Sequence, residues 1–135
     1  MAGYSGTPLA KKLGIKPGYK LGLVNAPKGF QKELAGMPEA VKITVSRLVG
    51  PLDLILLFLT SEKNLIKEFP KVKEKLSRTG MLWVAWPKKS SGVTTDLSFD
   101  VVQKFGLAAG LVDVKICAVN DIWSGLKFVY RLKDR

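Results

Sequence analysis

Hydrophobic and polar positions alternate along this chain in blocks that predict strands and helices in turn. Two continuous apolar runs, residues 54–59 (LILLFL) and 81–86 (MLWVAW), have the length of strands and are too short for isolated helices. Such runs are typical of strands buried on both faces of a parallel sheet. Residues 62–76 instead repeat apolar positions at intervals of four and three, which predicts an amphipathic helix. We therefore expect strands to alternate with covering helices.

Shorter patterns, together with glycine and proline boundaries, place the remaining elements. The expected strands are residues 19–24, 41–48, 54–59, 81–86, 112–119 and 126–132, and the expected helices are residues 8–13, 30–35, 62–76 and 99–109. Pro70 is expected to kink the third helix or break it in two, because it has no N–H to donate. Gly106 and Gly110 are expected to limit the last helix. Residues 1–7 form a flexible lead, 120–125 a hairpin turn and 133–135 a tail, within one domain of residues 1–135.

This order of elements predicts an α/β fold with three layers. Right-handed crossovers would place helices on both faces of a doubly wound, mostly parallel sheet. The run MLWVAW is expected to be a central strand, because Gly80 precedes it and Pro87 ends it. Trp83 and Trp86 are three residues apart and so point to opposite faces of the sheet. Each tryptophan is expected to pack under a helix.

Polar and cationic residues follow the expected parallel strands at their carboxyl ends, which is the edge where open α/β sheets bind ligands. The candidate ligand-binding residues are Asn25, Lys28, Thr60, Ser61, Trp86, Lys88, Lys89, Ser90 and Ser91. Ammonium groups, hydroxyls and a helix N-terminus suit a phosphate or a carboxylate. The Trp86 ring would then stack on a flat ligand. The alternative is a polar rim of ordinary loops, with Trp86 in the core.

Composition adds a strong positive charge and removes several kinds of chemistry. The chain has 22 basic and 11 acidic residues, a net charge of +11, and 18 of the basic residues are lysine. Such a charge favours anionic partners, including nucleic acid, although scattered lysines are also typical of a solvated surface. The absence of histidine excludes Ser-His and Cys-His catalysis and most zinc sites. The single cysteine, Cys117, lies in an apolar run, where a buried structural role is expected.

The remaining acidic and aromatic residues define no catalytic set. Asp53 and Asp113 are expected at the amino ends of strands, and the spacing of Asp96 and Asp121 defines no catalytic pair. Trp123 is expected either at the end of the molecule far from the ligand-binding edge or folded back onto that edge. No apolar run is long enough to span a membrane, and no leader is recognisable, so a cytoplasmic location is expected.

From residue 52 to residue 132 the order of elements resembles the second half of a class I methyltransferase-like Rossmann domain. This resemblance implies a sheet order of 2-1-3-4-6-5 with an antiparallel last strand. The chain departs from the family at three places. The loop Asn25-Ala26-Pro27-Lys28-Gly29 has one glycine, and the residues around Ser46, Arg47 and Leu48 replace the acidic residue that binds ribose. Thr60-Ser61-Glu62 replaces the Asn/Asp-Pro-Pro-aromatic motif.

The segments SGTPLAKKLGIKPG, LVNAP, MLWVAWPKKSSG and LVDVKICAV with DIWSGLKF also resemble a family of small bacterial proteins catalogued as a domain of unknown function. This second resemblance implies no activity, cofactor or site. Three functions stay open at this point. They are a Rossmann-like domain that binds an anionic, nucleotide-like small molecule, a methyltransferase with a degenerate S-adenosylmethionine loop, and a basic accessory protein that binds RNA or an acidic partner.

Overall fold

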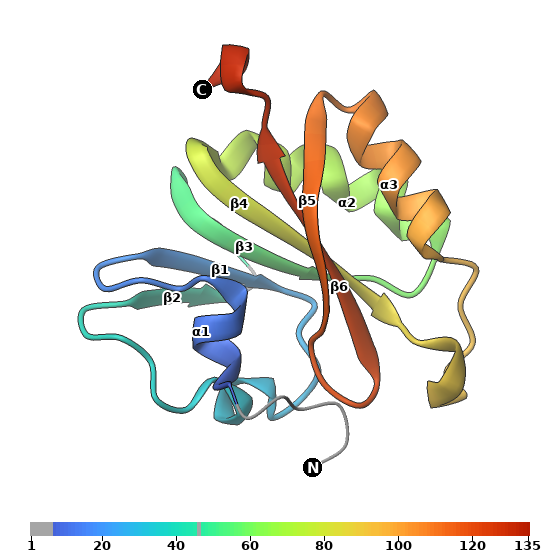
Figure 1. The fold of residues 1–135 in the computed structure, drawn as a ribbon, viewed down its shortest axis with the longest axis horizontal. Helices are drawn as coiled ribbons and strands as arrows, with labels where there is room; N and C mark the ends of the chain where they lie inside the picture. Colours follow the sequence, from blue (N-terminus) through green and yellow to red (C-terminus); the bar gives the residue numbers. More distant parts are fainter. Residues whose placement is uncertain (1–6, 46) are drawn as a thin grey trace.

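The computed structural model describes residues 7–45 and 47–135, and it contains one six-stranded sheet with the order β2-β1-β3-β4-β6-β5 (Figure 1). The strands are β1 (Lys20–Val24), β2 (Lys42–Val45), β3 (Leu52–Phe58), β4 (Leu76–Pro87), β5 (Leu111–Ala118) and β6 (Trp123–Tyr130). The first four strands are parallel to one another, and β6 is antiparallel to both β4 and β5. The predicted sheet order and the antiparallel last strand are thus confirmed.

Helices cover the two faces of the sheet unequally. On the face that we call the back lie α2 (Glu62–Lys75) and α3 (Phe99–Ala108), whereas the opposite, front face carries the short helix α1 (Leu9–Leu13) and the 3-10 helix η1 (Phe30–Leu34) (Figure 1). The 3-10 helices η2 (Lys89–Ser91) and η3 (Leu132–Asp134) lie in loops. The predicted lead of residues 1–7 falls outside the described residues except for Thr7.

Strand β4 divides its side chains between two apolar cores. Trp83 belongs to the front core and Trp86 to the back core, as their spacing predicts. The indole Nε1 of Trp83 donates a hydrogen bond of 2.9 Å to the carbonyl oxygen of Leu13, which is the last residue of α1. Because a buried indole N–H needs an acceptor, this bond anchors α1 to the centre of the sheet.

Several predicted boundaries differ from the structure, and the first two concern α2 and β6. Helix α2 runs unbroken through Pro70, so the predicted division into two helices is wrong. Pro70 and Ile66 both lie on the exposed side of α2, where water can satisfy the carbonyl that proline leaves without a donor, while Leu65, Phe69 and Val72 hold the other side against the sheet. The final strand ends at Tyr130, and residues 132–134 form η3.

The chain between β2 and β3 crosses the back face of β1 without a helix. The strand predicted for residues 41–48 ends at Val45, and Leu48 instead packs against the back core. A Cβ atom on Gly22 of β1 would lie 2.9 Å from Leu48 Cδ2, so the glycine makes room for this crossover. Ser46 lies outside the described residues. Arg47 is exposed beyond the end of β2.

Gly106 lies inside α3 and does not limit it, contrary to the prediction. A Cβ atom at this position would lie 2.1 Å from Cε1 of the Phe128 ring on β6. The glycine therefore lets α3 approach the sheet closely, and this close packing outweighs the low helix propensity of glycine.

We predict that Gly106→Ala lowers the free energy of unfolding by about 1–3 kcal/mol, because the methyl group overpacks the contact with Phe128. Helix propensity alone would make the same substitution stabilising by about 1 kcal/mol. Urea denaturation of this variant beside Lys104→Ala, an exposed position of α3, measures the difference. A stabilised Gly106→Ala protein would contradict the close packing of α3 on β6.

Candidate functional site

The carboxyl ends of β1, β3 and β4 lie at one edge of the sheet, which we call the carboxyl edge, as parallel pairing requires. The turn of the β5–β6 hairpin lies at the same edge, because β6 is antiparallel and Trp123 pairs with Pro87. The backbone N–H of Lys88 donates to the carbonyl oxygen of Ile122 at 2.8 Å. Of the two positions expected for Trp123, the structure shows the one at the carboxyl edge.

Aromatic side chains fill the front side of the carboxyl edge. The rings of Phe30 and Phe58 meet edge to face with centroids 4.8 Å apart, and Phe58 meets Trp123 in the same way at 5.0 Å. Asn120 ties the hairpin turn to η1, because its Nδ2 donates to Glu33 Oε1 at 2.9 Å. On this side, therefore, side chains of the protein itself occupy the space beside the loops after β1 and β3.

The loop after β1 reverses the chain through two residues with positive φ. Asn25 has φ of 58° and Gly29 has φ of 81°, and the N–H of Phe30 donates to the carbonyl of Pro27 at 3.0 Å. This turn buries Phe30 and leaves Asn25 and Lys28 exposed at the edge. The five-residue η1 takes the place of the helix predicted for residues 30–35.

On the back side of the edge, the chain itself occupies the N-terminus of α2. Ser61 Oγ accepts a hydrogen bond of 3.2 Å from the N–H of Asn64, and Asp96 Oδ1 accepts one of 2.8 Å from the N–H of Glu62. Thr95 Oγ1 donates to the carbonyl of Thr60 at 2.6 Å. The carboxylate of Asp96 thus takes the position that a bound anion would take at a helix N-terminus. A shallow depression of about 380 Å³ remains, lined by Thr60, Ser61, Thr94, Thr95 and Asp96.

In the loop after β4, the side chain of Ser91 forms hydrogen bonds within the loop and stabilises its conformation. Ser91 Oγ donates to the carbonyl of Lys88 at 2.6 Å and accepts from the N–H of Val93 at 3.2 Å. Lys89 and Ser90 are exposed, and Lys88 is half-buried. Within residues 7–45 and 47–135, the ammonium groups of Lys28, Lys88 and Lys89 form no hydrogen bond or ion pair; the ion pair found there joins Lys71 and Glu68.

Trp86 lies in the back core with 5% of its surface exposed, beside Val24, Leu59 and Leu97. Its ring therefore offers no open face on which a flat ligand could stack. The structure brings Thr60 and Ser61 together with Asp96, a contact between loops 34 residues apart in sequence that no local motif indicates.

A larger cavity, of about 690 Å³, lies at the opposite edge, between the C-terminal ends of α2 and α3 and the last residue of β6. Its cations already have partners within the chain. Lys73 Nζ donates to the carbonyl of Ala109, and the guanidinium of Arg78 lies 4.8 Å from the Tyr130 ring centroid and donates to the carbonyl of Asp134. The bond from Lys73 satisfies a carbonyl group that follows α3, as a cationic C-terminal cap does, and the bond from Arg78 satisfies one in η3.

Residues 7–45 and 47–135 contain neither a cluster of metal-ligating side chains nor a membrane-spanning helix. There, no three His, Cys, Asp or Glu side chains come close enough to hold a metal ion. None of the helices in this part has the length and apolar character needed to cross a membrane. Burial is the main influence on the thiol of Cys117 and raises its pKa, so the thiol is protonated at neutral pH.

Solved structures that resemble this chain include methyltransferases. A SAM-dependent methyltransferase from Aquifex aeolicus has a TM-score of 0.66 and 14% identity, over 89% of this chain and 86% of that chain. The DhpI–SAH complex has a TM-score of 0.64 and 9% identity, over 93% and 83%. The ribosomal protein L11 methylase from Lactobacillus delbrueckii subsp. bulgaricus has a TM-score of 0.60 and 12% identity, over 91% and 75%.

These likenesses show the fold, which is the methyltransferase-like Rossmann fold. No protein-family model matches the sequence, and no curated protein matches it. The resemblance to small bacterial proteins, the candidate ligand-binding residues and the cytoplasmic location therefore stay predictions.

We predict that Asp96→Ala lowers the free energy of unfolding by about 0.5–2 kcal/mol, because the N–H of Glu62 loses its acceptor. Asp96→Asn should cost less, since the amide oxygen can still accept the bond. Asp121→Ala, at an exposed position of the hairpin turn, is the matched control and should change the stability by less than about 0.5 kcal/mol. Equal unfolding midpoints for the three variants in urea would show that Asp96 does not cap α2.

Proposed function

We propose that this chain is a binding domain of methyltransferase-like fold that holds an anionic, nucleotide-like small molecule at the carboxyl edge. The observation that carries the proposal is the charge at this edge. Lys28, Lys88 and Lys89 have no ionic partner among the described residues, whereas Asp96 and Glu33 are held by bonds to Glu62 and Asn120. Asp121 alone of the acidic residues in the surrounding loops forms no bond with the described part of the chain. Neutral N–H groups bind the carboxylates of Asp96 and Glu33, so the three ammonium groups remain free to contact an anion.

The phosphate groups are the part of such a ligand that these residues favour. A lysine ammonium binds phosphate as a flexible point charge, and the loops after β1 and β4 supply three of them. Arg47, exposed after β2, stands near the position where the methyltransferase family would have an acidic residue for ribose. A cation at that position suits a phosphate better than a hydroxyl group.

The second candidate is methyl transfer from S-adenosylmethionine. The likeness to methyltransferases, including the DhpI–SAH and DhpI–SAM–HEP complexes, favours it. Against it stand the single glycine in the loop 25–29 and the carboxylate of Asp96, which is bonded to the N–H of Glu62. We therefore place it second.

We predict that ATP, used as the probe, binds to the native protein and binds about 2- to 30-fold more weakly to the double variant Lys88→Ala with Lys89→Ala. This range corresponds to about 0.2–1 kcal/mol for each exposed charge contact. Isothermal titration calorimetry measures the affinity, with inorganic phosphate, S-adenosylmethionine and S-adenosylhomocysteine as further ligands. The unfolding midpoint of the variant should change little, since neither lysine side chain forms an ion pair or a hydrogen bond with the described residues.

The matched control is Lys67→Ala with Lys104→Ala, which removes the same charge from exposed positions of α2 and α3. Equal weakening by both double variants would mean that only the overall charge matters, and unchanged affinity in the first would remove the Lys88–Lys89 loop from the site. If S-adenosylmethionine bound more tightly than ATP, the second candidate would take first place.

A further inference from the structure

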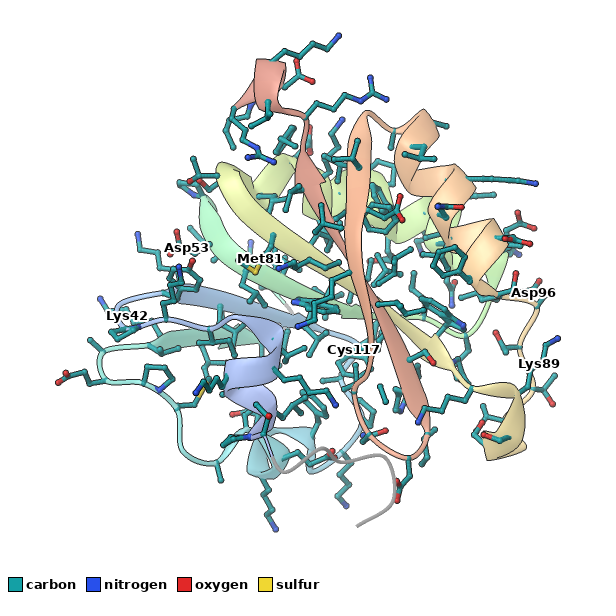
Figure 2. The ribbon with its side chains drawn as sticks, in the orientation of Figure 1. Lys42, Asp53, Met81, Lys89, Asp96 and Cys117 are labelled. Carbon is teal, nitrogen blue, oxygen red and sulfur yellow. The ribbon has the colours of Figure 1, made fainter. Side chains whose placement is uncertain are left out.

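None of the helices in residues 7–45 and 47–135 covers the front face of the sheet over its β5–β6 side. Figure 1 shows α1 over the blue and green strands, and α2 and α3 behind the sheet, while β5 and β6 face the viewer. Figure 2 places Cys117 and Met81 on this open side. Side chains that point forward from β4, β6 and β5 are therefore covered only in part.

Strand register puts lysines side by side on this open face. Lys115 of β5 pairs with Lys127 of β6, which pairs in turn with Trp83 of β4. Because paired residues point to the same side of a sheet, both lysines share the front face with Trp83. The Lys127 Nζ atom lies 5.8 Å from the centroid of the Trp83 ring, which is itself fully buried.

Two more lysines reach the same place from α1 and the loop that follows it. Lys12 Nζ donates to the carbonyl oxygen of Ala118, next to Cys117, at 2.7 Å. Lys12, Lys115 and Lys127 all act to lower the pKa of the Cys117 thiol, although burial outweighs them. Burial, followed by Lys115 and Lys16, lowers the pKa of Lys127. The four ammonium groups are thus close enough to one another, or to the common thiol, to interact.

Carboxylates do not compensate these four charges. Lys12, Lys16, Lys115 and Lys127 form no ion pair with any described residue. Asp113 of β5 pairs with Phe128 on the back face and accepts a bond of 3.2 Å from Gln103. Asp53, which Figure 2 shows near Met81, accepts a bond of 2.8 Å from the N–H of Lys20. Mutual repulsion among like charges is relieved when an anion binds.

We propose that the surface formed by Lys12, Lys16, Lys115 and Lys127 binds the phosphate backbone of single-stranded nucleic acid. The four lysines come from α1, its following loop, β5 and β6, so they present repeated charges along a sheet face, and a polymer with repeated charges matches that arrangement. An acidic protein fits less well, because protein interfaces depend on exposed aromatic and arginine anchors. Here the cations are all lysine and Trp83 is buried.

Binding of this kind is independent of base sequence and depends strongly on salt. Since the Trp83 ring beside these lysines is buried, phosphate contacts would supply most of the affinity. Each contact releases counterions, so four contacts give a slope of about −2.8 for log K against log[salt] with a single strand. Lys115 and Lys127 lie within β5 and β6 and not in the loops of the carboxyl edge, so variants of these two lysines should leave ligand binding at that edge unchanged.

The test uses a fluorescein-labelled 20-nucleotide poly(U) RNA and fluorescence anisotropy at 25–200 mM KCl. We expect the double variant Lys115→Gln with Lys127→Gln to lower the affinity and to reduce the slope to about −1.4, since two of four contacts are lost. The control Lys67→Gln with Lys104→Gln makes the same change in net charge on α2 and α3 and should keep the native slope. Because Lys127 packs on Trp83, a second variant, Lys16→Gln with Lys115→Gln, changes two exposed lysines only.

A second readout is the reaction of Cys117 with iodoacetamide, which bound poly(U) should slow, because the thiol lies near Lys12, Lys115 and Lys127. Absence of binding at 25 mM KCl would overturn the proposal. Equal slopes for the front-face variants and the α2–α3 control would also overturn it. The affinity would then depend on the total charge of the protein and not on the position of the lysines.

Discussion

The burial of β4 on both faces is the constraint on which the rest of this structure depends. Residues 82–86 of this strand lie between a parallel partner, β3, and an antiparallel partner, β6. Trp83 and Trp86 point to opposite faces of the sheet, and each large apolar ring must be buried under a helix. Helix α1 supplies the acceptor for the indole of Trp83 on the front, whereas the α2–α3 layer closes over Trp86 on the back. The two cores and the positions of the helices follow from that division.

The same constraint decides what the carboxyl edge can offer. Because β4 joins the parallel strands to the hairpin, the β5–β6 turn comes to the edge where ligands bind in related folds, and Trp123 packs on Phe58 there. Asp96, from the loop after β4, reaches the N-terminus of α2. The lysines at the carboxyl edge therefore remain without ion-pair partners among the described residues, while Trp123 and Asp96 occupy space beside them. A methyltransferase-like fold with this edge suits electrostatic binding of an anion better than deep enclosure of a cofactor.

Most of the architecture could be predicted from the sequence, because it depends on local patterns. The two buried runs identified β3 and β4, and the order of elements with the family resemblance gave the sheet order. The features that the sequence predicts wrongly depend on contacts between residues far apart in the chain. Pro70 is tolerated because it lies on the solvent side of α2. Gly106 lies inside α3 because the Phe128 ring occupies the space that a Cβ atom at residue 106 would need. The bond from Glu62 to Asp96 and the lysines that meet around Cys117 join segments far apart in sequence, so periodicity could not reveal them.

The central claim is that the carboxyl edge attracts anions through its loops, while Asp96 continues to occupy the N-terminus of α2. A titration of ¹⁵N-labelled protein with ATP, followed by the amide signals, tests it most directly. The account predicts that shifts gather at residues 25–29 and 88–91, and that the amide of Glu62 keeps its position. A large shift of Glu62, or shifts confined to the cavity beside Arg78 and Tyr130, would contradict it.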